Sequence, residues 1–360
     1  MMNEHEIARG MQADHAGSSG RGSPRDGGAA EQHELDGILF RKDRGDRYQI
    51  LELIGRGQLS TVHRARDVRT GEFVVLKRIE LLSIMDAKLR RDCVREVDHL
   101  RSLSHPTIIR YLDNYIQGES MELVIVLEWA RGGDLAGLLR AWQAAGVGVV
   151  DERVAWHYFV QVCDAVRHMH QRRLMHRDLK PSNIFLADEL EVVRRHLRPQ
   201  DAPGPGDADA MMADAQPAAD GRGLGHAREL SNIKVGDLGL SRYFSSKTCQ
   251  AHSSVGTPYY MSPELIRGLP YDWSSDVWSL GCLLYELRTC RNPFFTPGLN
   301  YYMLGKRICA AQYEPLPAGT SERMQSLVAA MLHPDHAQRP TIDQIYESAA
   351  GANAVLAVGG

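Results

Sequence analysis

The chain has 360 residues, of which 43% are hydrophobic, and a formal net charge of −3, so it can form one large two-lobed domain or two ordinary ones. A nucleic-acid-binding protein would carry a basic excess, and this chain carries none. No apolar run approaches the roughly 18 residues that cross a bilayer, no signal-peptide core is present, and the six cysteines are scattered without C-x-x-C spacing, so we expect a cytoplasmic protein with reduced thiols.

The first segment differs in composition from the rest of the chain. Residues 1–46 are rich in glycine, serine, histidine and charged residues and poor in aliphatic residues. Such a segment cannot bury enough apolar surface to offset the entropy lost on ordering. We therefore predict a disordered arm, followed from residue 47 by a folded domain.

The folded domain begins with a predicted β-hairpin. Residues 48–54 and 61–66 are rich in β-forming side chains, and the turn between them contains Gly55-Arg56-Gly57. Backbone amides of a glycine turn can lie over phosphate groups, although a hairpin with an ordinary glycine turn has the same pattern. A dinucleotide-binding fold would need a helix after the glycines, and the β-rich residues 73–79 argue against one.

Lys77 lies inside the apolar strand predicted for residues 73–79. A lysine that points inward from a strand is costly unless it is paired. The natural partner is Glu96, which faces inward on the helix predicted for residues 86–103. The alternative is a surface lysine on an edge strand.

A boundary between two lobes is predicted at residues 128–133. Strands near residues 109–115 and 123–127 lead into a segment whose glycines interrupt the sheet pattern, and a helix begins near Asp134. Extended backbone at Glu128 and Ala130 would offer hydrogen bonds to the edge of an adenine. Residues 151–173 then show a helical period with one apolar face, which indicates a buried core helix.

The core helix leads to residues 175–183, which place a carboxylate, an ammonium group and a carboxamide on one short loop. Phosphoryl transfer requires positioning and charge neutralisation rather than covalent chemistry by the protein. Asp178 would orient an attacking hydroxyl and accept its proton, Lys180 would lie against the transferred phosphate, and Asn183 would hold a magnesium ion. An H-R-D triplet alone is a weak signal, so this interpretation depends on the surrounding motifs.

Residues 187–232 interrupt the domain with a segment rich in proline, glycine, alanine and aspartate. A structureless loop of this length is usually disordered or functional rather than part of a core. The entropy of loop closure grows only logarithmically with length, so a surface turn can tolerate the insertion. We predict a disordered, passive insertion.

The fold resumes at a short strand that ends at Asp237, an oxygen donor between glycines that suits magnesium. Further on, Glu264 and Arg339 are predicted to form a buried ion pair. Such a pair adds little stability, but the loss of one partner is strongly penalised.

Taken together, these motifs resemble the eukaryotic protein kinase superfamily over about residues 48–347. The resemblance implies an α+β fold with two lobes: a small antiparallel sheet with one main helix (N-lobe, 47–127), a hinge (128–133) and a larger, mostly helical C-lobe (134–347), followed by a short tail (348–360). It implies a catalytic set of Asp178, Lys180, Lys77 and Glu96, magnesium ligands Asn183 and Asp237, and an ATP site formed by Ile54, Gly55, Arg56, Gly57, Val62, Val75, Lys77, Glu128, Ala130 and Phe185.

Within that superfamily the chain looks most like the short NIMA-related (NEK) kinases, which consist mainly of a catalytic domain. The motifs that carry this resemblance are Ile54-Gly55-Arg56-Gly57-Gln58-Leu59-Ser60, Asn183-Ile184-Phe185, Gly236-Asp237-Leu238-Gly239-Leu240 and Val255-Gly256-Thr257-Pro258-Tyr259-Tyr260-Met261-Ser262-Pro263-Glu264. Two departures are Ser60 in place of a third glycine and Val75 in place of the alanine that usually covers the adenine.

The resemblance also implies features of the segment between Asp237 and Pro263. Ser253 is the expected activating phosphosite, with Ser254 and Thr248 as the alternatives, and Thr257 is expected in the substrate platform. Leu240, which is not β-branched, goes with serine acceptors over threonine in this superfamily. Tyr111 stands where an aliphatic residue is usual; its ring would swing into the nucleotide cleft, or its hydroxyl would be satisfied in place.

We therefore expect an ATP- and Mg²⁺-dependent serine/threonine protein kinase that acts as a monomer on protein substrates, with an upstream kinase or an activating partner. The resemblance implies roles in the cell cycle and at the spindle, centrosome or cilium, and locations at the cytoskeleton, basal body or nucleus. A pseudokinase scaffold would have lost Lys77, Asp178 or Asp237, and a small-molecule phosphotransferase would lack the Glu264 and Arg339 motifs.

Overall fold

The computed structural model describes residues 32–35, 38–41, 47–57, 60–84, 90, 97, 100–117, 121–188, 230–237 and 258–358. Its strands are β1 (Gln32–Leu35), β2 (Ile38–Arg41), β3 (Tyr48–Arg56), β4 (Ser60–Asp67), β5 (Phe73–Glu80), β6 (Tyr111–Gln117), β7 (Glu122–Glu128), β8 (Ile184–Leu186) and β9 (Ile233–Val235). Its α-helices are α2 (Leu135–Ala144), α3 (Glu152–Gln171), α6 (Pro263–Ile266), α7 (Trp273–Thr289), α8 (Tyr301–Cys309), α9 (Glu322–Met331) and α10 (Ile342–Val358). Short 3-10 helices are η1 (Leu81–Ser83), η2 (Pro181–Asn183) and η5 (His336–Gln338).

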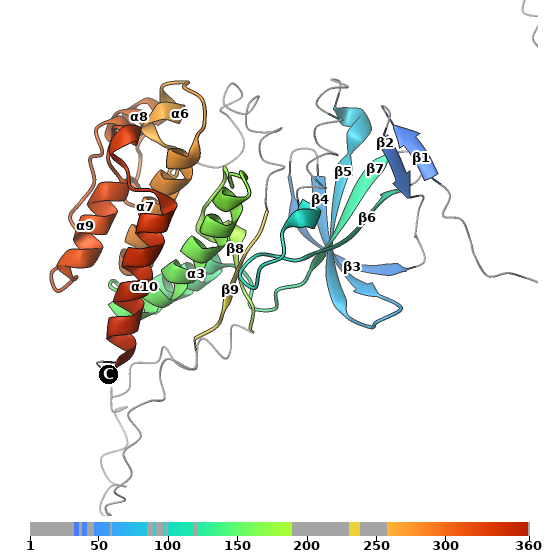
Figure 1. Ribbon diagram of the computed structural model, residues 1–360, viewed down its shortest axis with the longest axis horizontal. Helices are drawn as coiled ribbons and strands as arrows, with labels where there is room; N and C mark the ends of the chain where they lie inside the picture. Colours follow the sequence, from blue (N-terminus) through green and yellow to red (C-terminus); the bar gives the residue numbers. More distant parts are fainter. Residues whose placement is uncertain are drawn as a thin grey trace, which may run out of the picture.

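The N-terminal part is an antiparallel sheet with strand order β3-β4-β5-β7-β6 (Figure 1). Side chains alternate between its two faces, as a strand requires. On β5, Val74 and Leu76 enter one buried cluster, whereas Ile79 enters a second cluster with Val97. Val97 is helical, as is Leu100, in agreement with the helix predicted there. Lys77 shares the face of Ile79, which directs it away from the first cluster.

Two strands lie within residues 1–46, which the composition predicted to be disordered. β1 and β2 form an antiparallel hairpin, and Figure 1 shows it beside β6 at the edge of the larger sheet. The sequence contains a local β-forming run, Ile38-Leu39-Phe40, which the polar average of the arm obscures. The prediction of disorder is therefore corrected for these two strands.

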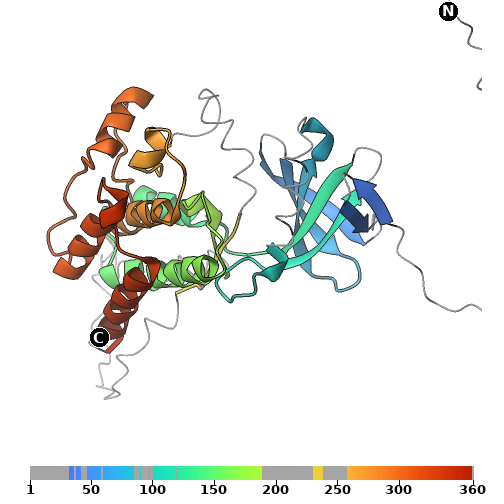
Figure 2. The ribbon, with the colours of Figure 1, turned by 45° about the horizontal axis from the view of Figure 1, so that its top comes forward.

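The C-terminal part is mostly helical and surrounds α3 and α7 (Figures 1 and 2). The apolar face predicted for residues 151–173 is buried in α3, including Trp156 and Phe159, and Val160 is partly buried against the same core. Asp151 caps this helix by accepting a hydrogen bond from the Arg153 amide at 2.8 Å. The observed sheet and helices agree with the predicted two-lobed α+β fold.

The C-terminal end differs from the predicted tail, because α10 continues to Val358. Ala349 and Ala352 are buried in the core of the helical part, and α10 lies against α3. Alanine has the highest helix propensity and fits close helix contacts, so the alanine-rich residues after 347 extend the last helix. Among the described residues, no helix has the length and apolar character needed to cross a membrane.

A small antiparallel sheet, β8 with β9, lies between the two parts. The pairing continues one step beyond the strands, where the Ala187 amide donates to the Asn232 carbonyl at 2.8 Å. The insertion predicted for residues 187–232 thus leaves and returns at adjacent points. Residues 189–229 lie outside the described part of the chain, so their predicted disorder stays a prediction.

Candidate active site

The three polar side chains predicted for catalysis lie together on the loop between α3 and β8. The Lys180 ammonium lies 2.7 Å from the Asp178 carboxylate. The Asn183 amide nitrogen donates to the same carboxylate at 2.9 Å and to the Asp178 carbonyl at 2.7 Å. Two donors therefore fix one oxygen of Asp178. The loop thus presents a half-buried carboxylate with the positive charge of Lys180 next to it.

The backbone of this loop is hydrogen-bonded to Asp276, a fully buried residue of α7. Its carboxylate accepts hydrogen bonds from the amides of His176 at 2.9 Å and Arg177 at 3.0 Å. His170 contributes another contact at 2.8 Å, and the Tyr271 hydroxyl donates as well. Burial alone would raise the pKa of Asp276, but the hydrogen bond from His170 and the nearby positive charges lower it. Asp276 is therefore an ionised anchor of the loop.

His176 connects the loop to the segment that leads from β9 to Asp237. Its ring nitrogen Nε2 lies 3.1 Å from the Gly236 carbonyl, and the Gly236 amide donates to the Asn183 carbonyl at 2.9 Å. A Cβ at position 236 would lie 2.7 Å from the Phe185 ring and 2.9 Å from Ile109. Only glycine allows the chain after β9 to pass this close to β8. Because Asn183 directly precedes β8 and Asp237 follows Gly236, this close approach brings the two residues near each other.

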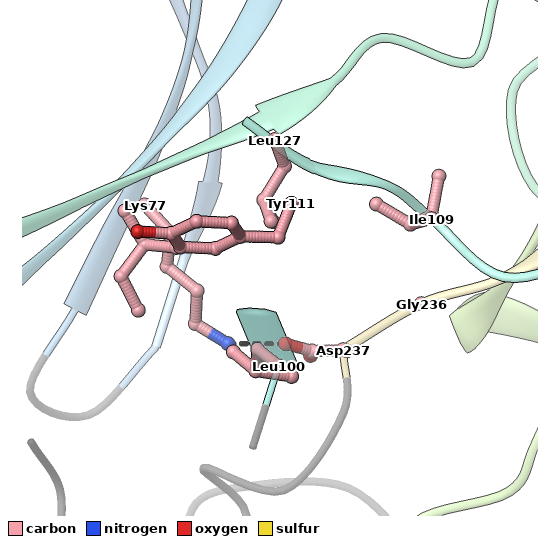
Figure 3. Close-up of a pocket in the computed structure, with 8 residues that line it drawn as sticks. Lys77, Leu100, Ile109, Tyr111, Leu127, Gly236 and Asp237 are labelled. Atoms are coloured by element: carbon pink, nitrogen blue, oxygen red, sulfur yellow. Dashed lines mark hydrogen bonds and ion pairs between the residues drawn. The ribbon is translucent and has the colours of Figure 1, made fainter. Parts of the chain in front are cut away.

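Lys77 and Asp237 meet across the cleft between the two parts, where the Lys77 ammonium pairs with the Asp237 carboxylate (Figure 3). The positive charge of Lys77 lowers the pKa of Asp237, against the opposing effect of burial. The Lys77 side chain is only 12% exposed, which excludes the alternative of a surface lysine. Glu96, the partner predicted for Lys77, lies outside the described residues.

A small, mostly apolar pocket lies beside this ion pair, and Lys77 and Asp237 form part of its lining. Figure 3 shows Leu127 and the Tyr111 ring above the Lys77 ammonium, Ile109 to the right, and Leu100 below the ion pair. The Tyr111 hydroxyl donates to the side chain of Asn114. The hydroxyl is therefore satisfied in this arrangement. The swing predicted for a disengaged Glu96 stays a prediction, because Glu96 lies outside the described residues.

The residues predicted to cover the nucleotide lie on adjacent strands above the cleft. Val62 on β4 is the ladder partner of Lys77, and Val75 on β5 is the partner of Leu127. The glycine turn is closed by a hydrogen bond of 2.7 Å from the Gly57 amide to the Ser60 carbonyl. The remaining predicted residues, Ile54, Gly55 and Arg56, form the end of β3.

The predicted adenine-reading segment leads from β7 to α2. Glu128 ends β7, and Ala130, two residues further on, is buried, with 8% of its surface exposed. Among the described residues, none pairs with the backbone amide or carbonyl of Ala130, so a donor and an acceptor are left for a ligand, as an adenine edge requires. Phe185 forms an isolated bridge with Asp134, directly below this segment.

The two predicted metal ligands supply oxygen atoms. The side-chain nitrogen of Asn183 donates to Asp178, so its side-chain oxygen is the atom available to an ion. The carboxylate of Asp237 would supply the other protein oxygen. In the described part of the chain, no group of three His, Cys, Asp or Glu side chains could hold an ion alone. This donor set fits a hard divalent cation that takes its remaining ligands from water and phosphate oxygens.

Some predicted residues cannot be placed, and some important ones were not identified from the sequence. Glu96, the phosphosite Ser253 and the platform residue Thr257 lie outside the described residues. The sequence indicated no role in the site for His170 or Asp276. The repeated histidines six residues apart, His170 and His176, were the available signal.

The ion pair predicted between Glu264 and Arg339 is confirmed. The Arg339 guanidinium donates two hydrogen bonds of 2.9 Å to the Glu264 carboxylate, and Ser275 donates a third at 2.7 Å. Burial opposes ionisation of Glu264, but these donors lower its pKa to about 2. Glu264 lies on α6, Ser275 on α7, and Arg339 directly follows η5. These contacts therefore hold the three elements together.

Comparison with known proteins gives a consistent result. Residues 48–349 match the pattern of the protein kinase domain. The chain is 32% identical over 303 residues to the probable serine/threonine-protein kinase nek2 of Dictyostelium discoideum, covering 83% of this chain and 62% of that protein. It is 31% identical over 310 residues to the serine/threonine-protein kinase Nek2 of Homo sapiens, covering 85% and 60%, and 31% identical to Nek8 of Danio rerio, covering 83% and 36%. The chain thus spans less than two thirds of the length of these relatives.

Proposed function

Because the chain belongs to the protein kinase domain family and is of the NEK type, we propose that it is a serine/threonine protein kinase that transfers the γ-phosphate of ATP to other proteins. The observation that carries this proposal is the Asp178 carboxylate, fixed by Lys180 and Asn183 on one loop. A carboxylate that orients an acceptor hydroxyl and takes its proton, beside a fixed positive charge, is what phosphoryl transfer requires of a protein.

In this proposal the residues of the site have separate tasks. Asp178 orients the acceptor hydroxyl and accepts its proton, and Lys180 offsets the negative charge of the phosphoryl group. Lys77 holds the α- and β-phosphates, and the backbone of Glu128 and Ala130 binds the adenine. Asn183 and Asp237 hold Mg²⁺, which neutralises phosphate charge when bound. Because Asp276 and His176 fix the loop before substrates arrive, little of the binding energy is spent on ordering it.

The substrates and the cellular role follow from the family and belong to the proposal. We expect serine acceptors to be preferred over threonine, because Leu240 is not β-branched. The resemblance to NEK kinases supports a role in the cell cycle and at the spindle, centrosome or cilium, in the cytoplasm or nucleus, under the control of an upstream kinase or partner. The rival function is a kinase-like scaffold, and the presence of Lys77, Asp178 and Asp237 favours the enzyme.

The proposal is tested with purified protein, ATP, Mg²⁺ and an array of serine and threonine peptides. Asp178→Asn should lower the transfer rate by about 10²–10⁴-fold and leave ATP affinity nearly unchanged, because Asp178 acts on the acceptor. Lys77→Met should lower activity by misplacing the phosphates. Asp343→Asn, at an exposed acid on α10, is the matched control and should keep full activity. A parent chain that transfers no phosphate would refute the enzyme and favour a scaffold, and substantial activity in both site variants would show that Asp178 and Lys77 do not carry the activity.

A further inference from the structure

We propose that Lys234 is a positioning residue that holds the adenine-reading hinge in register with the strand leading to Asp237. This inference rests on the proposed function, because it concerns the same ATP site. Lys234 lies on β9, opposite Phe185 on β8. Its ammonium group lies 2.8 Å from the Glu128 carboxylate. The two side chains are 23% and 17% exposed, so the ion pair is largely shielded from solvent.

Glu128 receives two further hydrogen-bond contacts at this point. Its carboxylate accepts a hydrogen bond from the Arg110 amide at 2.7 Å, and its own amide donates to the Arg110 carbonyl at 3.0 Å. One side chain at the end of β7 is therefore bound to a neighbouring backbone segment and to β9. Without Lys234, the carboxylate would lose its charged partner on the C-terminal side of the cleft.

The same backbone segment is hydrogen-bonded to β9 itself. The Val235 amide donates to the Thr107 carbonyl at 2.8 Å, and the Ile109 amide donates to the Val235 carbonyl at 2.8 Å. A continuous network therefore runs from Glu128 through Arg110 and residues 107–109 to Val235, two residues before Asp237. The ion pair of Lys234 with Glu128 closes this network into a ring.

The chemical consequence concerns the adenine end of the nucleotide. Ala130 lies two residues after Glu128, so holding Glu128 in place restricts the positions that Ala130 can take. A hinge that is already oriented pays less ordering entropy when a ligand binds. Breaking the ion pair should therefore weaken binding of the adenine moiety and leave the phosphate-binding residues Lys77 and Asp237 in place.

The experiment compares the affinities of adenosine and ADP by calorimetry in the full chain and its variants. Lys234→Met should weaken both ligands by the same factor, about fivefold, which is typical of one partly shielded ion pair. Lys234→Arg, which keeps the charge, should restore the affinities. Lys306→Met removes an exposed lysine on α8 and serves as the matched control. In a Glu128→Gln background, Lys234→Met should have almost no further effect, because the two residues act as a pair.

Several outcomes would overturn the inference. Unchanged adenosine affinity in Lys234→Met would do so, and so would weakening of ADP alone, which would indicate a charge effect on the phosphates. A raised kcat at unchanged affinity would mean that the pair restrains the lobes instead. A parent chain that binds nucleotide but phosphorylates no peptide would refute the proposed function and leave this test intact.

Discussion

At the scale of single residues, Glu286 on α7 is a carboxyl group whose ionisation should depend on pH near neutrality. The Tyr260 hydroxyl donates to it, and the Tyr260 carbonyl accepts from Ser279 at 3.1 Å. Burial raises the pKa of Glu286 to about 7, and the hydrogen bond from Tyr260 offsets this only in part. The folded protein therefore keeps a proton that the unfolded chain, with a carboxyl pKa near 4.5, releases earlier.

A pH-dependent loss of stability follows. The contribution of Glu286 is fully present below about pH 4.5 and declines as pH rises through about 7, by roughly 3 kcal/mol at most. The glutamine side chain of Glu286→Gln cannot ionise. The free energy of unfolding of this variant, relative to that of the parent, should therefore increase between about pH 5 and 8, the range over which the Glu286 pKa shift acts. Urea unfolding at several pH values measures this difference. Glu347→Gln, at an exposed position of α10, is the control; parallel curves for parent and Glu286→Gln would contradict the prediction.

The residues of the site differ in how far the sequence predicted them. Asp178, Lys180 and Asn183 lie within six positions, so their proximity follows from chain connectivity alone. The contacts of Asp276 with the loop join residues about 100 positions apart. No local pattern encodes such a contact, because it depends on where α7 packs.

At the scale of elements, strands and helices with a clear period were predicted to within a few residues. β3, β4, β5 and β7 follow from β-forming runs, and α3 follows from its apolar face and its Asp151 cap. The β1–β2 hairpin was missed, because four-residue strands show too little alternation to stand out in a polar arm. The continuation of α10 was missed because an alanine-rich end lacks the large apolar residues that mark a buried face.

The insertion between β8 and β9 should be dispensable for catalysis. Its ends are joined by the Ala187–Asn232 hydrogen bond of 2.8 Å and by the Asp188 amide, which donates to the Ser231 hydroxyl at 3.1 Å. His157 on α3 lies 3.2 Å from the Ser231 carbonyl. A turn that replaces residues 189–230 would thus keep these contacts between the described residues.

We expect this deletion to retain most of the kinase activity and the melting temperature of the parent. Limited proteolysis of the parent should cut first within residues 189–230. A second deletion that also removes Ser231 and Asn232 is the matched comparison, and it should lower stability because it breaks the ladder and the His157 contact. Loss of most activity in the shorter deletion would mean that the insertion takes part in catalysis.

At the scale of the whole molecule, the site exists only where the two parts meet. Lys77 belongs to the N-terminal sheet, Asp237 lies two residues after β9 of the small sheet, and their ion pair crosses the cleft. The order of motifs along the chain predicted both parts, but not the networks that orient them. The ring through Lys234 and Glu128 uses a charged pair that the sequence alone does not single out from other surface charges.

Activation should also act on the whole molecule, through Arg177. Its amide is fixed by Asp276, and its guanidinium lies 5.9 Å from the centre of the Tyr271 ring. Among the described residues, no carboxylate pairs with this guanidinium. A cation beside the catalytic Asp178 is thus available to an anion from the segment after Asp237, which includes Ser253, outside the described residues.

Phosphorylation of Ser253 would supply that anion. A phosphate–arginine contact is a charge-assisted hydrogen bond of about 1.5–3 kcal/mol, which is enough to shift a segment between two arrangements and to order the substrate platform at Thr257. Ser253→Ala should therefore lower kinase activity about tenfold or more, with little change in melting temperature. Ser246→Ala, closer to Asp237, is the control and should be nearly neutral.

Arg177→Met should lower activity and make Ser253→Ala almost silent, because both changes remove the same contact. Mass spectrometry of the active enzyme should find phosphate on Ser253, and a fully active preparation without it would end this interpretation.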